Sequence, residues 1–137
     1  MNKLFVYGTL RSDTIHVVIP GVAPYINRIA TGYVKGKLFD LGEYPGAIKD
    51  DDESCKVYGE IVEINPGKLE FVLESLDEYE EVDKDESKSL FRREQTTAIT
   101  DEGEEIKVWI YWYNQEVESS KEIKDGIFRK RKNTTAA

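Results

Sequence analysis

The segment at residues 105–113, EIKVWIYWY, limits the possible folds more than any other part of the chain. Its side chains fall into two alternating sets, Ile106, Val108, Ile110 and Trp112 in one and Lys107, Trp109, Tyr111 and Tyr113 in the other. A period of two is typical of a β-strand, and both faces of this one are largely apolar or aromatic. Such a strand must be covered on both sides, so we predict that it is central in its sheet.

Four further segments are rich in β-branched and aromatic residues, and we predict that they are strands. They are residues 3–7, 28–41, 56–64 and 90–100. A short loop that contains Gly103 separates the last of these from residues 105–113, which predicts an antiparallel β-hairpin. Gly32 and Gly36 interrupt residues 28–41, where we expect a bend, a bulge or the close approach of another backbone.

One segment has the spacing of an amphipathic helix. Asn65 is a favoured N-cap and Pro66 is favoured in the first helical turn, so we expect the helix to begin there. Apolar side chains then recur at helical spacing, at Leu69, Val72, Leu73, Leu76 and Tyr79. Elsewhere, residues 42–46 (GEYPG) predict a turn, and residues 50–53 predict a solvated acidic loop.

Together these elements predict an α+β fold, with a small curved sheet, mixed or antiparallel, that tends to close into a barrel and carries one main helix. The length of 137 residues corresponds to one domain. We predict that this domain occupies residues 1–120 and that residues 121–137 form a basic C-terminal tail. Four cations at residues 129–132 mark this tail, which we expect to be solvated.

Charge and cysteine content limit the partners and the compartment. Without the four cations of the tail, the chain has 15 basic and 27 acidic side chains, a net charge of -12, which argues against nucleic-acid binding. The apolar run before Gly8 is far shorter than a signal-peptide core or a membrane span. Cys55 is the only cysteine, which fits a reducing compartment. We expect a cytoplasmic protein without nucleic-acid or membrane partners, and the oligomeric state stays open.

Metal and cofactor chemistry have no support in the residue types. His16 is the only histidine, and Cys55 has no second soft ligand, so we expect no metal site. A Cys-His nucleophile pair is formally possible, but no flanking pattern supports it. Gly8 belongs neither to a phosphate-binding loop nor to a dinucleotide fingerprint, so we expect no cofactor. Carboxylate chemistry or plain binding remains.

Two segments stand out together, FVYGTLR at residues 5–11 and LDEYE at residues 76–80, with GEYPG between them. Their order and separation resemble the gamma-glutamylcyclotransferase-like family, which includes gamma-glutamylamine cyclotransferases and AIG2-like proteins. The resemblance implies a cofactor-independent enzyme of acyltransferase or lyase type that acts on a small gamma-glutamyl substrate. It also implies that Glu80 is the catalytic acid/base. The substrate-binding loop that it implies consists of Tyr7, Gly8, Thr9 and Leu10.

The implied reaction suits these residue types. The α-amino group of a gamma-glutamyl amide attacks the side-chain carbonyl, closes the ring of 5-oxoproline and expels an amine, so no enzymic nucleophile is required. One glutamate can take a proton from the α-ammonium and return one to the leaving amine. We expect burial and the like charges of Asp77, Glu78 and Glu81 to raise the pKa of Glu80. Backbone N–H groups near Gly8 would bind the substrate carboxylate or the oxyanion, and Arg11 would add a positive charge.

Two positions depart from the family pattern. Glu81 follows Glu80 where glycine is often found, and Phe91 stands where tyrosine is common. Taken alone, an acidic helix end is usually a solvated face, and YGTL is an ordinary strand-to-turn junction. The alternative to an enzyme is therefore a non-catalytic module that binds a small carboxylate-bearing metabolite. A third hypothesis is an adaptor that contacts an acidic partner through its basic tail.

Overall fold

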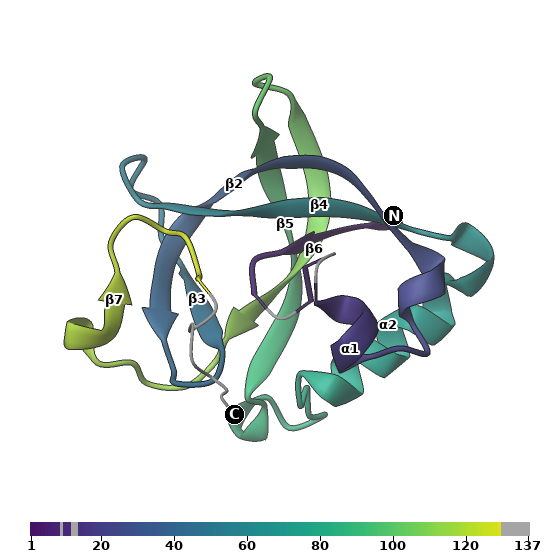
Figure 1. The fold of residues 1–137 in the computed structure, drawn as a ribbon. Helices are drawn as coiled ribbons and strands as arrows, with labels where there is room; N and C mark the ends of the chain where they lie inside the picture. Colours follow the sequence, from purple (N-terminus) through teal and green to yellow (C-terminus); the bar gives the residue numbers. More distant parts are fainter. Residues whose placement is uncertain (9, 12–13, 130–137) are drawn as a thin grey trace.

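A computed structural model describes residues 1–8, 10–11 and 14–129 of the protein. Five strands follow one another in the order β2-β4-β1-β6-β5, and β5 pairs with β2 to close a barrel (Figure 1). They are β1 (Lys3–Val6), β2 (Ile26–Asp40), β4 (Lys56–Ile64), β5 (Phe91–Thr100) and β6 (Glu105–Tyr113). Neighbours in the barrel are antiparallel except β1 and β6, which pair in parallel at Leu4 and Trp109. The predicted α+β class, with a curved sheet closed into a barrel, is confirmed.

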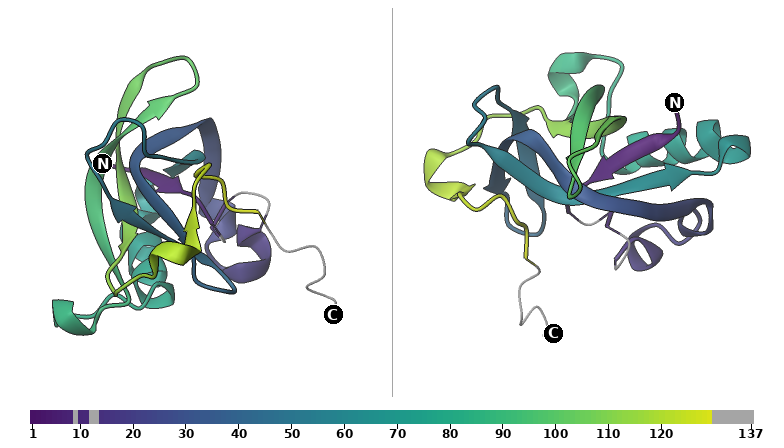
Figure 2. Two further views of the ribbon diagram at one scale, coloured as in Figure 1. Left: turned by 90° about the vertical axis from the view of Figure 1, so that its left-hand side faces the viewer. Right: turned by 90° about the horizontal axis from the view of Figure 1, so that it is seen from above.

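Two short extra strands, which the sequence patterns did not predict, extend the far end of β2. They are β3 (Pro45–Lys49) and β7 (Glu122–Ile123), and both pair with β2 in antiparallel fashion. These strands lie on one side of the barrel, and the helices lie on the opposite side (Figure 2). The turn predicted at residues 42–46 ends earlier than expected, because Pro45 already begins β3, at the first position of a strand, where proline is tolerated.

Two α-helices and four short 3-10 segments complete the described elements. They are α1 (Ile15–Val18), α2 (Leu69–Tyr79), η1 (Ala23–Tyr25), η2 (Pro66–Lys68), η3 (Glu86–Lys88) and η4 (Ser119–Lys121). The predicted helix begins where expected, because Asn65 Oδ1 accepts a hydrogen bond from Gly67 N at 2.9 Å, but its first turn is the 3-10 segment η2. Of the helices in the described residues, none is long and apolar enough to cross a membrane.

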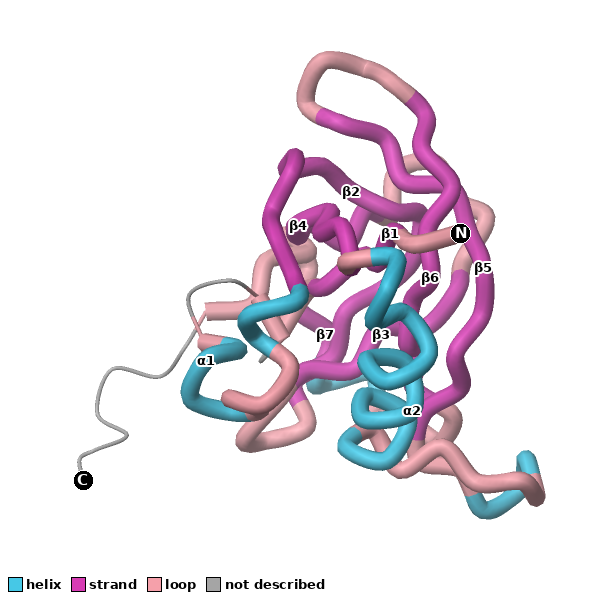
Figure 3. The backbone as a smooth tube through the Cα atoms, turned by 90° about the vertical axis from the view of Figure 1, so that its right-hand side faces the viewer, coloured by secondary structure: helices cyan, strands magenta, loops and turns pink. Residues whose placement is uncertain are grey.

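The two faces of β6 pack into two different apolar cores. Val108, Ile110 and Trp112 join the core formed by the strands of the barrel, together with Phe5, Tyr7, Val34, Leu38, Ala47, Val57, Ile61 and Ala98. Tyr111 joins a second core, under α2, whose buried members include Val72 and Leu76. Figure 3 shows α2 lying against this side of the barrel. The prediction that residues 105–113 are covered on both faces is therefore confirmed.

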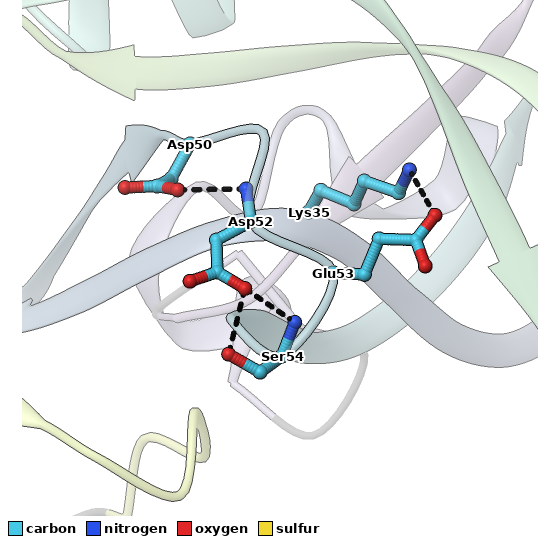
Figure 4. Close-up of polar contacts among 5 residues, drawn as sticks. All are labelled: Lys35, Asp50, Asp52, Glu53 and Ser54. Atoms are coloured by element: carbon cyan, nitrogen blue, oxygen red, sulfur yellow. Dashed lines mark hydrogen bonds and ion pairs between the residues drawn. The ribbon is translucent and has the colours of Figure 1, made fainter.

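The acidic loop between β3 and β4 is held in shape by its own side chains (Figure 4). Asp50 Oδ1 accepts a hydrogen bond from Asp52 N at 2.9 Å. Asp52 Oδ1 accepts from the backbone N–H and the hydroxyl of Ser54, at 2.9 and 2.7 Å. Lys35 Nζ lies 3.4 Å from Glu53 Oε1. Asx turns of this kind are stable in water, so this segment is the solvated loop that the sequence predicted.

Residues beyond the predicted domain boundary at residue 120 also contact the barrel. β7 pairs with β2, Gly126 O accepts a hydrogen bond from Tyr58 N at 2.9 Å, and Phe128 packs against the barrel core. Residues 130–137 of the predicted basic tail lie outside the described residues. The position of the boundary between domain and tail stays a prediction.

Candidate active site

A cavity of about 280 Å³ lies where the end of β1, the loop before β3, the end of α2 and the strands β5 and β6 meet. Its lining residues are Phe5, Val6, Tyr7, Gly8, Leu10, Glu43, Tyr44, Pro45, Tyr79, Glu80, Glu81, Leu90, Phe91 and Tyr111. Most of them are apolar or aromatic, and their only charged groups are three carboxyl groups. The fold thus brings together the two segments that the sequence singled out, which are about seventy residues apart.

Glu80 stands at the C-terminal end of α2, where its backbone N–H donates to Leu76 O at 2.8 Å. Its side chain lines the cavity and is partly buried. Burial raises the pKa of Glu80 to about 8, and the nearby charge of Glu81 contributes to the increase. An α-amino group titrates in the same range, near 8, so a proton can pass between the two groups at little cost in free energy.

Asp77 does not raise the pKa of Glu80 as the sequence led us to expect. Its carboxylate accepts two hydrogen bonds from Arg93, with Nε to Oδ1 at 2.7 Å and Nη2 to Oδ2 at 3.0 Å, and one from the Tyr111 hydroxyl at 2.7 Å. The bidentate ion pair neutralises Asp77. The guanidinium also lies 4.6 Å from the centroid of the Trp109 ring. These contacts tie the end of α2 to β5 and β6 and so fix the helix end that carries Glu80.

Asp77→Asn is expected to lower the free energy of unfolding by about 2 kcal/mol, because it leaves the partly buried Arg93 guanidinium without its counter-charge. Urea denaturation would measure the loss. Glu63→Gln is the matched control, since it removes an ion pair with Lys3 that is more exposed and longer, at 3.9 Å. The control is expected to cost less than about 0.5 kcal/mol. Equal losses in the two variants would contradict a bracing role for Asp77.

Three of the four residues of the predicted substrate-binding loop, Tyr7, Gly8 and Leu10, line the cavity. Thr9 lies outside the described residues. Gly8 has no room for a side chain, because a Cβ there would lie 2.7 Å from Cγ of Pro45. Only glycine lets the backbone come this close to Pro45 at the cavity wall. Leu10 is buried in the core under α2, so its side chain also holds the loop in place.

The Tyr7 hydroxyl already has partners inside the protein. It donates to Tyr111 O at 2.6 Å and accepts from Ala47 N at 3.1 Å. Burial, with a smaller effect from the charge of Glu80, raises the pKa of Tyr7, so this hydroxyl keeps its proton. Tyr7 therefore links β1 to β3 and β6, and the proton of its hydroxyl is already donated.

Tyr7→Phe is expected to lower the free energy of unfolding by about 2 kcal/mol, because the buried N–H of Ala47 loses its acceptor. Thermal and chemical denaturation would measure this loss. Tyr58→Phe serves as the control, because the Tyr58 ring is 38% exposed, and it should change stability by less than about 0.5 kcal/mol. A Tyr7→Phe variant as stable as the wild type would show that the two hydrogen bonds contribute nothing to stability.

Arg11, which we expected to add a positive charge, is not among the described residues that line the cavity. Its Nε donates to Gly8 O at 3.3 Å, and its guanidinium lies 5.9 Å from the centroid of the Phe128 ring. Arg11 thus holds the turn after Gly8 from outside the cavity, and the C-terminal segment supports it.

The sequence patterns did not assign the aromatic wall of the cavity. Tyr44, Phe91 and Tyr111 belong to this wall. The ring centroids of Tyr44 and Phe91 lie 6.1 Å apart, and those of Phe91 and Tyr113 lie 5.3 Å apart. Tyr44 in the GEYPG segment and Phe91 at a position where tyrosine is common were the only sequence clues. Their meeting depends on closure of the barrel, which no local pattern encodes.

The site offers one basic carboxyl group, aromatic walls and a close-packed backbone at Gly8. In the part of the chain that the structure describes, no group of three or more His, Cys, Asp or Glu side chains could hold a metal ion. These groups suit proton transfer and the orientation of a small substrate.

A five-stranded mixed barrel with one main helix, and a glutamate of raised pKa in a cavity at the helix end, define the class of protein. The chain belongs to the gamma-glutamyl cyclotransferase, AIG2-like family, whose model matches residues 4–130. The resemblance found in the sequence is thereby confirmed. No curated protein matches the chain significantly.

Solved structures share this fold. An AIG2-like protein from Mus musculus is 22% identical, with a TM-score of 0.66 over 85% of this chain and 80% of its own. YkqA from Bacillus subtilis is 24% identical, with a TM-score of 0.65 over 93% of this chain, which spans only 39% of the length of YkqA. The uncharacterized protein PH0828 from Pyrococcus horikoshii is 20% identical, with a TM-score of 0.59 over 93% of this chain and 90% of its own. At these identities the likeness establishes the fold.

Proposed function

We propose that the protein is a gamma-glutamyl cyclotransferase-type enzyme, which releases 5-oxoproline and a free amine from a gamma-glutamyl amine, peptide or related amide. The observation that carries the proposal is the position of Glu80, which lines a cavity of about 280 Å³ together with Gly8 and has a pKa of about 8. Membership of the family supports the reaction class. The lone Cys55 supports the cytoplasm as the place of action.

In the proposed reaction the substrate binds in a folded conformation, with its α-nitrogen against its own side-chain carbonyl carbon. Glu80 takes a proton from the α-ammonium, and the nitrogen attacks the carbonyl to form the new C–N bond. Backbone N–H groups near Gly8 stabilise the oxyanion. The bond to the leaving nitrogen then breaks as Glu80 delivers a proton to it. The two protons that the α-nitrogen loses are the two that the leaving nitrogen gains when it departs as an ammonium ion.

The walls of the cavity serve two purposes in this reaction. The rings of Tyr44, Phe91 and Tyr111 exclude water from Glu80, which keeps its carboxyl group basic. They also hold the flexible gamma-glutamyl chain in its folded form, and well-oriented intramolecular reactions reach effective molarities of about 10⁵ M or more. Because the substrate supplies its own nucleophile, the proposed reaction requires neither a metal nor a cofactor.

Mass spectrometry tests the proposal directly. The wild-type protein is incubated with a pooled library of gamma-glutamyl amides and peptides, and the products are searched for 5-oxoproline and the matching free amines. We expect both products in equal amounts from at least one member of the library. Binding of library members without any product would contradict the enzyme and favour a non-catalytic module that binds a carboxylate-bearing metabolite.

A further inference from the structure

Glu81 adopts a backbone conformation that glutamate disfavours. Its φ is 54°, the only positive φ of a non-glycine residue in the described chain. The Glu81 N–H donates to Glu78 O at 3.1 Å, and the Val82 N–H donates to Asp77 O at 2.9 Å. This pair of hydrogen bonds is a Schellman C-cap of α2, and its left-handed position is most often glycine. The backbone alone therefore favours glycine at position 81.

The side chain of Glu81 lines the same cavity as Glu80, from an exposed position. Residues held in sparsely populated backbone conformations cluster at functional sites, where the side chain offsets the cost of the strain. At position 81 the group that a glycine would lack is a carboxylate beside the carboxyl group of Glu80.

We propose that Glu81 is a positioning residue of this site: it holds a negative charge beside Glu80 and thereby keeps the Glu80 carboxyl group able to carry a proton at neutral pH. The catalytic meaning of this role rests on the proposed function. The charge of Glu81 itself, and its effect on Glu80, do not depend on turnover.

The other groups that face Glu80 leave this role to Glu81. Tyr7 from β1, Tyr44 from the loop before β3 and Tyr111 from β6 all have a raised pKa and stay neutral, mainly because they are buried. Arg93 neutralises Asp77 on α2. Glu43 also lines the cavity, but Glu81 is the charge that raises the pKa of Glu80. No lysine or arginine is among the described residues of the cavity wall, so no cation there offsets this effect.

The test compares Glu81→Gln and Glu81→Gly with Glu78→Gln. Glutamine removes the charge and keeps the disfavoured backbone, whereas glycine removes both. Glu78 is exposed at the same helix end and does not line the cavity, so its substitution is the matched control. An NMR titration of ¹³C-labelled carboxyl groups, with Glu80 assigned from the Glu80→Gln spectrum, measures the pKa of Glu80 without any need for turnover.

We expect the pKa of Glu80 to fall by roughly half a unit in both Glu81 variants and to stay unchanged in Glu78→Gln. The melting temperature should rise by about 4 °C in Glu81→Gly, because the strained residue is gone. In turnover assays the acidic limb of kcat/KM should move to lower pH by the same half unit, roughly.

An unchanged Glu80 pKa in both Glu81 variants, or an equal fall in the Glu78→Gln control, would overturn the role of Glu81. So would a Glu81→Gly variant less stable than the wild type. A wild-type protein that forms no 5-oxoproline would refute the proposed function instead, and the NMR titration would still decide whether Glu81 controls the protonation of Glu80.

Discussion

Glu80→Gln is expected to lower kcat/KM for 5-oxoproline release by about 10³-fold, because an amide cannot relay the protons of the ring closure. The residual rate would come from substrate orientation alone, which the substitution leaves in place. Quantitative mass spectrometry of 5-oxoproline at several substrate concentrations would measure the change. Glu78→Gln, at an exposed position on the same helix end, should turn over at the wild-type rate. Equal rates for the wild type and Glu80→Gln would reject Glu80 as the base.

The same substitution should stabilise the fold at alkaline pH. The pKa of Glu80 is raised from 4.5 to about 8 on folding, so between these values the folded protein binds a proton that the unfolded chain releases. The contribution of Glu80 to the free energy of unfolding therefore falls as pH rises from about 4.5 to about 8. Near pH 8.5, Glu80→Gln is expected to exceed the wild type by about 3 kcal/mol.

Urea denaturation of both proteins at half-unit steps from pH 5 to pH 9 would measure this difference, where the gap should widen steadily with pH. Parallel stability profiles across this range would show that Glu80 titrates like an exposed glutamate. In that case its proposed role as a proton relay near neutral pH would lose its physical basis.

Gly32→Ala is expected to lower the free energy of unfolding by about 3 kcal/mol or more, because the barrel closes at this residue. Gly32 on β2 pairs with Thr100 on β5, and a Cβ at Gly32 would lie 2.1 Å from the carbonyl oxygen of Ile99. Neither backbone can move away without loss of the pairing between β2 and β5. Chemical denaturation would report the loss as a lower transition midpoint.

Gly21→Ala provides the control for this prediction. Gly21 has no atom within 4 Å of a built Cβ, so the same chemical change should alter stability by no more than about 0.5 kcal/mol. If Gly32→Ala is as stable as Gly21→Ala, the contact between β2 and β5 does not hold the barrel closed in solution.

Local patterns were sufficient for the elements whose own side chains determine them. The alternation at residues 105–113 predicted a strand covered on both faces, and residues 56–64 are β4 with the same bounds as predicted. β3 escaped prediction, because Pro45 and Gly46 are typical of a turn. They stand in a strand only because β2 pairs with them and because Gly46 has no room for a Cβ, which would lie 2.9 Å from Cβ of Tyr113.

The candidate site was predictable only in part for the same reason. The resemblance pointed to Glu80 and the loop at residues 7–10, and the raised pKa of Glu80 followed from its expected burial and from Glu81. The effect of Asp77 was predicted wrongly, because its partner Arg93 lies sixteen residues further along the chain. Neutralisation by a distant residue cannot be inferred from the order of acids along a helix. The catalytic role of Glu80 stays a prediction.

The parallel pairing of β1 with β6 has a consequence for the birth of the protein. Leu4, in the first strand to be synthesised, finds its partner Trp109 only when most of the chain has been made. Contacts so distant in sequence slow folding. A nascent or truncated chain that ends before β6 leaves β1 and β5 each without a barrel neighbour, and such open edges favour association between chains. Expression at low temperature or with chaperones should therefore increase the yield of monodisperse protein.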